Sequence, residues 1–121
     1  MGDNVKNAAL EALREDVRQF ARERDWEQFH SPKNLAIGLS VEASEILEHF
    51  QWLSQAESGS LPEDTRDAVR LELADVFIYL IRLADTLDVD LVNAAREKMK
   101  VNADKYPVEK VKGNATKYDR L

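Results

Sequence analysis

Residues 71–84 read Leu71-Glu-Leu-Ala-Asp-Val-Phe-Ile-Tyr-Leu-Ile-Arg-Leu-Ala84 and predict a helix that is apolar around almost its whole circumference. At about 100° per residue, the interruptions share one sector of roughly 80° and are Glu72, Asp75, Tyr79 and Arg82. A helix of this kind must be covered on nearly every side, and four helices cannot easily enclose one of their own number. The stretch therefore predicts an all-α protein that assembles into an oligomer, with this helix near the shared core.

Hydrophobic residues recur at helical spacing in four segments of the chain. We expect helices over about residues 5–24, 32–53, 67–87 and 88–105. Ser31-Pro32 is a typical helix start, and Pro107 cannot comfortably continue the last helix. Residues 54–65 have the composition of a loop, and residues 107–121 are expected to form a polar arm or tail after a domain of residues 1–106.

Composition restricts the classes of partner. The formal net charge of -6 argues against polymeric nucleic acid, for which a strongly basic surface is expected. No cysteine is present, which excludes disulfides and thiolate metal sites. No run approaches the roughly 20 apolar residues that span a bilayer, and the N-terminus lacks an apolar signal segment. We expect a cytoplasmic protein without a membrane partner.

Two acidic pairs, Glu42-x-x-Glu45 and Glu72-x-x-Asp75, interrupt the apolar faces of the second and third predicted helices. The i, i+3 spacing places both members of a pair on one helix face, and an antiparallel helix pair would turn the two faces toward each other. Carboxylates are seldom buried without compensation, so four of them suggest a bound hard cation such as Mg²⁺. The competing interpretations are acids on ordinary amphipathic helices, or a di-iron bundle, which needs Glu-x-x-His units that this chain lacks.

Basic and aromatic residues offer further candidates for binding. Lys98, Asn102 and Lys105 fall at i, i+4 and i+7, with Tyr106 at the helix end, and could be a phosphate clamp or a solvated basic face. Trp26, Trp52 and Tyr79 could stack on a nucleobase or belong to the core. Arg82 could pair with Asp75 or Asp85 or reach phosphate, and we expect the structural pairing. We expect His30 to be a capping or structural residue, and Gly38 to let a ligand or another helix approach the backbone closely.

The ordered combination of motifs resembles the MazG-type all-α nucleotide pyrophosphohydrolases, most of all their small dCTP pyrophosphatase-like branch. The resemblance covers about residues 17–120. The motifs that carry it are Phe20-Ala21-x-Glu23-Arg24-Asp25-Trp26-Glu27-Gln28-Phe29-His30-x-Pro32-x-Asn34-Leu35, Glu42-x-x-Glu45 with Phe50-Gln51-Trp52, Glu72-Leu73-x-Asp75-Val76-x-Ile78-Tyr79-Leu80, and Lys98-Met99-x-x-Asn102-x-x-x-Tyr106-Pro107.

The resemblance implies a four-helix protomer, a homotetramer built as a dimer of dimers, and Mg²⁺-dependent cleavage of a nucleoside triphosphate to the monophosphate and pyrophosphate. It implies that the metal ligands are Glu42, Glu45, Glu72 and Asp75. The base or sugar would be contacted by Trp26, Trp52 and Tyr79, with Phe20 and Asn34 as additions, and the phosphates by Lys98, Asn102, Lys105 and Tyr106. For the chemistry we expect Glu45, with Glu42, to orient water, and Lys98 to stabilise the leaving pyrophosphate. A house-cleaning role toward dCTP or modified pyrimidine deoxynucleotides follows.

Two departures from the family pattern leave alternatives open. Val41 stands where many members have a doubled glutamate, and Val17 stands where some deoxycytidine-type relatives have a histidine. The water-activating residue and the base preference are therefore open. The competing functions are a nucleotide-binding module without turnover, a structural oligomer whose acids are paired by Arg82 and lysines, and an enzyme like phosphoribosyl-ATP pyrophosphohydrolase.

Overall fold

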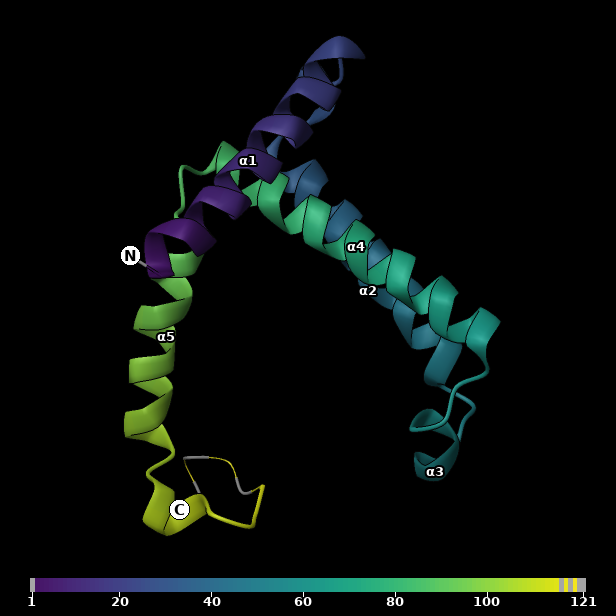
Figure 1. Cartoon of the computed structure of the whole chain (residues 1–121), viewed down its shortest axis with the longest axis vertical. Helices are drawn as coiled ribbons and strands as arrows, with labels where there is room; N and C mark the ends of the chain where they lie inside the picture. Colours follow the sequence, from purple (N-terminus) through teal and green to yellow (C-terminus); the bar gives the residue numbers. More distant parts are fainter. Residues whose placement is uncertain (1, 116, 118, 120–121) are drawn as a thin grey trace. The chain divides into compact units, whose positions relative to one another are not determined.

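The chain forms two structural units, Met1–Asp88 and Val89–Leu121, which are described separately. The structure is a computed structural model that describes residues 2–115, 117 and 119, with side chains from residue 8 onward. These residues form six α-helices, one 3-10 helix and connecting turns, with no strand among them (Figure 1). The predicted all-α class is confirmed.

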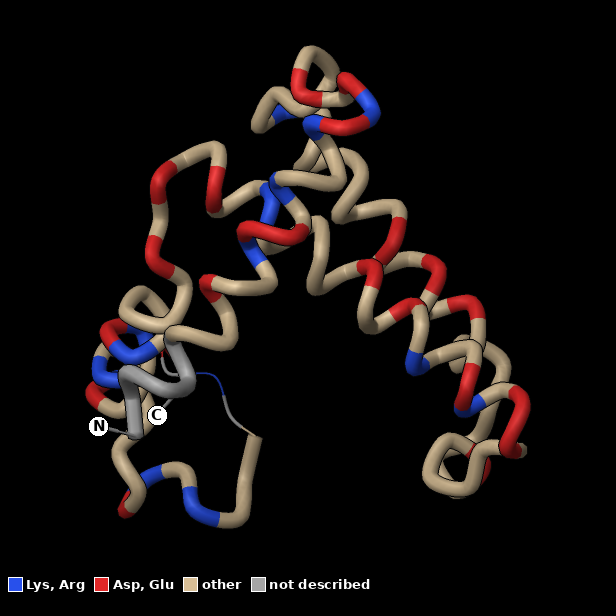
Figure 2. Tube along the Cα trace, turned by 45° about the horizontal axis from the view of Figure 1, so that its top comes forward, with Lys and Arg blue, Asp and Glu red and all other residues tan. Residues whose placement is uncertain are grey.

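The first unit is organised around an antiparallel helix pair. Its elements are α1 (Gly2–Glu23), η1 (Glu27–Phe29), α2 (Pro32–Phe50), α3 (Gln55–Ser58) and α4 (Glu63–Thr86). Helices α2 and α4 lie side by side along their lengths, and α1 packs against α4 (Figures 1 and 2). Among the described residues, the buried apolar side chains are Ala21, Leu35, Val69, Ile81 and Ala84, of which all but Val69 and Ala84 are only 2% exposed.

Local chemistry sets the entry into α2. Helix α1 ends in a Schellman motif, in which the Trp26 amide donates to the Ala21 carbonyl (2.9 Å) and the Asp25 amide to the Arg22 carbonyl (3.1 Å). Asp25 takes the left-handed conformation that this motif needs, with φ at 55°. Helix α2 then starts as predicted, with the Ser31 hydroxyl accepting from the Asn34 amide (3.1 Å) and Pro32 in the first turn.

The segment between α2 and α4 differs from its prediction. Helix α2 ends at Phe50 rather than near Leu53, because Ser54 starts the short helix α3 with a capping box to Glu57. Helix α4 begins at Glu63 rather than near residue 67. Pro62 is the N-cap residue, and the acidic residues of the first turn interact well with the helix dipole. The predicted loop is therefore shorter and partly helical.

The second unit contains α5 (Leu91–Lys105) and α6 (Val108–Val111). Helix α5 begins later than expected from residue 88, because Asp88 is left-handed (φ 55°) and Asp90 is the N-cap, accepting from the Asn93 amide at 3.0 Å. The predicted polar arm starts with the single turn of α6 instead of an extended chain. Residues 116, 118, 120 and 121 of that predicted arm lie outside the described residues.

Large apolar side chains of α2 and α4 are exposed in the single chain. Leu71 and Leu73 of α4 and Leu47 of α2 are each more than half exposed. The same holds for Ile37, while Phe77 is 44% exposed. This pattern is what the all-round apolar character of α4 leads one to expect of a helix that needs further cover. None of the helices, as far as the structure describes them, combines the length and apolarity needed to cross a membrane.

Candidate functional site

The facing sides of α2 and α4 carry a stripe of mostly polar residues. On each helix they recur every three or four positions and so share a face. Three pairs mark the antiparallel alignment: His49 with Glu72, Gly38 with Tyr79, and His30, just before α2, with Arg82. The stripe consists of Asn34, Gly38, Glu42, Glu45 and His49 on α2, and Glu72, Asp75, Tyr79 and Arg82 on α4.

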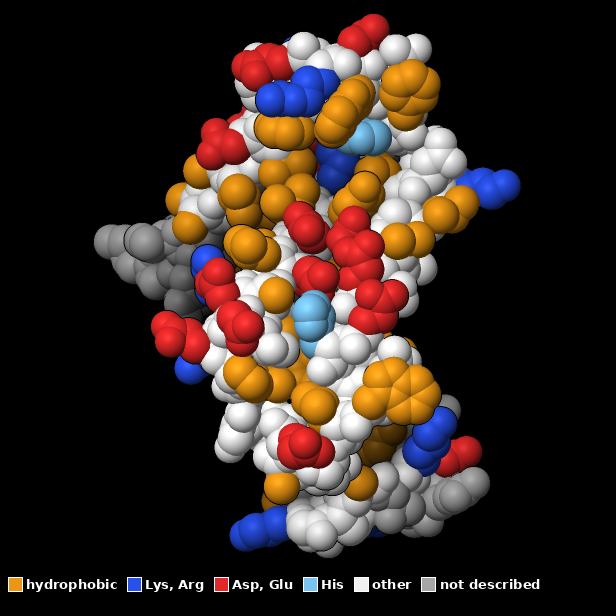
Figure 3. All heavy atoms as spheres, turned by 90° about the vertical axis from the view of Figure 1, so that its right-hand side faces the viewer, with side chains coloured by type: hydrophobic (Ala, Val, Ile, Leu, Met, Phe, Trp, Pro, Cys, Tyr) orange, Lys and Arg blue, Asp and Glu red, His pale blue; other side chains and the backbone are white. Residues whose placement is uncertain are grey.

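The four predicted carboxylates lie near one another in the middle of this stripe. Burial, a hydrogen bond with Glu45, and the negative charges of Glu45, Asp75 and Glu72 raise the pKa of Glu42 above its usual range. In Figure 3, acidic side chains gather at the centre of one face, with hydrophobic side chains above and below them. The sequence prediction that the two acidic pairs face each other is therefore consistent with this charge coupling across α2 and α4.

Two carboxylate oxygens of this cluster are buried and have no hydrogen-bond partner in the described structure: Oε2 of Glu42 and Oε2 of Glu72. A buried carboxylate oxygen without a partner loses its hydration without compensation, which is costly. The two oxygens come from different helices of the pair. A cation bound between α2 and α4 would give both of them a partner.

His49 contacts the acidic cluster and was not among the predicted site residues. Its Nε2 lies 2.8 Å from Glu72 Oε2, which is an ion-pair distance if the ring is protonated, although the geometry gives that oxygen no hydrogen bond. The sequence carried a signal for it, because His49 follows Glu45 by four residues and so shares its helix face.

The donor set suits a hard divalent cation, since it consists of carboxylate oxygens. Within the described residues, no three or more histidine, aspartate or glutamate side chains already converge into a coordination shell. The acids thus form a cluster whose side chains would have to rotate to coordinate one ion together. The residues fit such an ion by donor chemistry and by the two unpartnered buried oxygens.

Aromatic side chains surround the end of the stripe nearest η1. The Schellman motif after α1 places Trp26 edge-to-face with Phe20, at 5.8 Å between ring centroids, and Trp26 lies 6.3 Å from the His30 ring. Phe20 and Trp26 are about half exposed. Asn34 supports this turn, because its side-chain amide donates to the Phe29 carbonyl at 3.1 Å. Exposed rings of this kind can stack on a nucleobase.

Arg82 is the buried charged residue of α4, at 8% exposure. Its Nε donates to His30 Nδ1 at 3.1 Å, and its guanidinium lies 3.4 Å from Asp85. Of the two predicted partners, Arg82 therefore pairs with Asp85. Asp85 also accepts two hydrogen bonds from Arg18 of α1, at 2.9 and 2.5 Å, and this pairing, more than any other influence, lowers the pKa of Asp85. In the described structure Arg82 does not neutralise the acidic cluster.

Gly38 and Tyr79 meet in the stretch between the aromatic end and the carboxylates. A Cβ on Gly38 would overlap with Tyr79 Cε1, closer than real Cβ atoms come to another heavy atom. The absence of a side chain at this position lets the Tyr79 ring lie against the α2 backbone. The close approach predicted at Gly38 is thus made by a tyrosine of the neighbouring helix.

The remaining predicted residues are spread over both units. Trp52 follows α2 in the first unit and is 86% exposed. Lys98, Asn102 and Lys105 share one face of α5, and Tyr106 is its C-cap, so this stripe belongs to the second unit.

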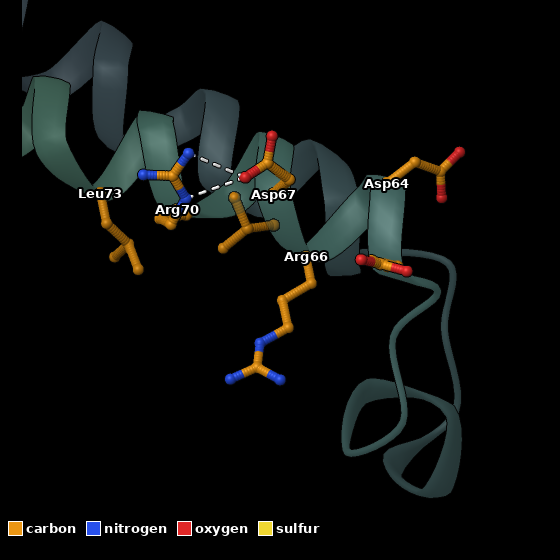
Figure 4. Close-up of a pocket in the computed structure, with 7 residues that line it drawn as sticks. Asp64, Arg66, Asp67, Arg70 and Leu73 are labelled. Carbon is orange, nitrogen blue, oxygen red and sulfur yellow. Dashed lines mark hydrogen bonds and ion pairs between the residues drawn. The ribbon is translucent and has the colours of Figure 1, made fainter.

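A surface hollow lies elsewhere, between Glu63 and Leu73, and Figure 4 shows its lining side chains on α4 alone. Because the Arg70 and Asp67 charges pair there (2.8 Å), it offers no convergent set of polar groups.

Comparison with known proteins places these features in a family. Residues 37–121 match the model of the MazG-like family. Over 114 residues the chain is 46% identical to dCTP pyrophosphatase 1 of Mus musculus and 42% identical to that of Homo sapiens, covering 93% of this chain and 67% of each relative. It is also similar to the crystal structure of a pyrophosphatase from Archaeoglobus fulgidus DSM 4304, with a TM-score of 0.78, 40% identity, and coverage of 82% of this chain and 93% of that one.

Proposed function

The chain belongs to the MazG-like family, and on that premise we propose that it is a nucleoside triphosphate pyrophosphohydrolase that cleaves dCTP or a modified pyrimidine deoxynucleotide to the monophosphate and pyrophosphate. Such an activity removes unwanted nucleotides from the precursor pool, a house-cleaning role. The relatives named dCTP pyrophosphatase 1 support the choice of substrate.

The observation that carries this proposal is the acidic cluster between α2 and α4, with one buried carboxylate oxygen on each helix that has no hydrogen-bond partner among the described residues. The oxygen on α4, Glu72 Oε2, has His49 Nε2 as its neighbour at 2.8 Å. Four mutually repelling acids destabilise a fold unless their charge has a use or a counter-ion. A triphosphate with a divalent cation supplies that counter-ion, whereas a purely structural oligomer would gain nothing from the cluster.

Glu42, Glu45, Glu72 and Asp75 would hold the divalent cation, which we propose to be Mg²⁺. When bound, such an ion neutralises phosphate charge and lowers the pKa of water. Glu45 accepts a hydrogen bond from the attacking water and orients it in line with the α-phosphorus, and Glu42 beside it receives or shares the proton. The bond from the α-phosphorus to the bridging oxygen breaks, and Lys98 stabilises the departing pyrophosphate.

Further residues would hold the rest of the substrate. Trp26, Trp52 and Tyr79 would contact the base and sugar, with Asn34 holding the turn on which the aromatic cluster depends. Lys98, Asn102, Lys105 and Tyr106 of α5 would hold the phosphates as hydrogen-bond donors. We further propose residues 1–106 as the catalytic domain, a cytoplasmic location, and no partnership with polymeric nucleic acid.

Assembly as a homotetramer, a dimer of dimers, would cover the apolar surface. The exposed large side chains of α2 and α4 support an assembly in which these helices lie at the shared core. Helix bundles commonly pack around the apolar faces of helices such as α2 and α4.

Product analysis tests the activity directly. Incubation with dCTP, 5-methyl-dCTP and Mg²⁺ should yield the monophosphate and pyrophosphate in equal amounts, separated by ion-exchange chromatography. Glu45→Gln should lower kcat by about 100-fold or more, as loss of a water-orienting group typically does. Glu48→Gln is the matched control, because it makes the same substitution at an exposed glutamate of the same helix, and it should retain activity. The proposal is refuted if the protein releases no monophosphate from any of the deoxynucleoside triphosphates that are tested.

A further inference from the structure

The contact between Arg82 and His30 fixes the tautomer of the imidazole. A guanidinium has only hydrogen-bond donors, so the atom that accepts from Arg82 Nε must be a nitrogen with a lone pair. That atom is Nδ1 of His30, at 3.1 Å. In the neutral ring the proton therefore lies on Nε2.

The ring is also kept neutral. Burial, followed by the positive charge of Arg82, lowers the pKa of His30 below its ordinary value, so the imidazole is uncharged at pH 7. Arg82 itself is held by Asp85, which Arg18 also binds. The imidazole is thus anchored at Nδ1 by a residue whose own position is fixed.

The second ring nitrogen of His30, Nε2, is free to donate to a ligand. Nε2 has no hydrogen-bond partner among the described residues, and it is not one of the fully buried unpartnered atoms. His30 is half-buried and lies beside the exposed ring of Trp26. Tyr79 follows on α4, one turn from Arg82 toward the carboxylates. A hydrogen-bond donor of fixed direction therefore lies between a stacking platform and the acidic cluster.

We propose that His30 is a specificity-determining residue, whose Nε2 hydrogen is donated to the O2 carbonyl of a pyrimidine base, and that Arg82 is the positioning residue that fixes this tautomer. The inference rests on the proposed function and names the group that reads the base. An O2 carbonyl is present in cytosine, thymine and uracil and in their 5-modified forms, whereas adenine has no carbonyl. A site with a dedicated donor discriminates against a base that lacks the matching acceptor.

Replacing O2 by sulfur provides the test, because sulfur is a poorer acceptor on a base of nearly the same shape. We expect the parent to prefer dCTP over 2-thio-dCTP by about tenfold in kcat/KM, and to bind dCMP more tightly than 2-thio-dCMP by calorimetry, by a similar factor. His30→Phe should lower kcat/KM for dCTP and the affinity for dCMP by about tenfold each. Its preference for the oxygen compounds over the 2-thio compounds should then be close to one. His30→Gln retains a donor near Nε2 and should recover most of the preference, and Lys33→Gln, exposed in the first turn of α2, should match the parent.

Imidazole ¹⁵N spectroscopy tests the role of Arg82 without turnover. With two histidines in the chain, His30→Phe assigns the signals. The His30 spectrum should show the Nε2-protonated tautomer in the parent and a mixture in Arg82→Met. A parent that hydrolyses dCTP while His30→Phe keeps the full oxygen-over-sulfur preference, or a His30 protonated at Nδ1, would overturn the inference and leave the proposed function standing. A parent without any turnover would instead refute the proposed function, while the dCMP binding comparison and the tautomer would still decide the role of His30.

Discussion

Asp85 shows how one carboxylate joins two helices, since this residue of α4 binds Arg18 of α1. Its pKa is lowered, mainly by the hydrogen bonds from Arg18, so the folded protein binds fewer protons than the unfolded chain at acid pH. The stabilisation is complete above about pH 5 and is lost as the pH falls through the ordinary value of 3.8 toward the lowered one. We expect Asp85→Asn to reduce the free energy of unfolding by about 2 kcal/mol at pH 7, with a difference that shrinks in acid.

Urea denaturation of the parent and Asp85→Asn between pH 3 and pH 7 measures this difference. Asp67→Asn is the matched control, because Asp67 is likewise paired with an arginine one turn away, Arg70. The side chains of Asp67 and Arg70 are both more than half exposed. That pair should contribute less than about 0.5 kcal/mol. Equal effects of the two substitutions at pH 7 would contradict the account.

Gly38 offers a second prediction at the scale of one residue. Ala in place of Gly favours a helix interior by about 1 kcal/mol, but its Cβ would collide with the Tyr79 ring. We expect Gly38→Ala to change stability by no more than about 2 kcal/mol, because the two effects oppose each other. It should nevertheless weaken dCMP binding, which calorimetry measures, since Tyr79 must move. Gly59→Ala meets only an ordinary contact at 3.6 Å and should leave binding unchanged.

Individual residues were predictable to different degrees. The acids of the cluster are evident from sequence because they interrupt apolar faces at helical spacing. The contact between His30 and Arg82 joins residues 52 positions apart and depends on how α2 and α4 align, which no local pattern specifies. For the same reason, the sequence does not decide whether Arg82 pairs with Asp75 or with Asp85.

At the scale of the element, the entry into α2 can be tested. We expect Ser31→Ala to reduce the free energy of unfolding by about 1 kcal/mol, because the Asn34 amide loses its capping partner. Chemical denaturation followed by circular dichroism measures the change. Ser40→Ala is the control: the Ser40 hydroxyl bonds the Ala36 carbonyl within the same helix, so its removal should be neutral or slightly stabilising. A larger loss from Ser40→Ala than from Ser31→Ala would refute the capping role.

The long helices were predictable because each has an apolar period of helical spacing, and α2 in addition has a recognisable start at Ser31-Pro32. The short ones were not, since α3 and α6 have four residues each and contain too little sequence for a period to show. The capping box of Ser54 and Glu57 was present as a local signal for α3. The apolar pattern of α4 begins after its acidic first turn, so the pattern alone predicts a start that is about one turn too late.

At the scale of the whole molecule, the all-round apolar character of α4 predicted an oligomer, whereas the arrangement of subunits cannot be derived from the pattern of one chain. Leu73, Phe77 and Leu80 form a stripe on the side of α4 opposite the acids, and each is at least 36% exposed in the single chain. If this stripe lies in the shared core, a charge there would be buried without a partner when the subunits associate, at a cost of several kcal/mol.

We therefore expect Phe77→Arg to shift the sedimentation-equilibrium mass from that of a tetramer toward dimers or 13.8 kDa monomers, with the helix content of the first unit retained. Ser60→Arg places the same charge on an exposed connection and should leave the mass unchanged. A parent that sediments as a monomer would contradict the proposed assembly as a whole. A tetramer that persists in Phe77→Arg would instead show that subunits associate through another surface, because an arginine cannot be accommodated in an apolar interface of native packing density.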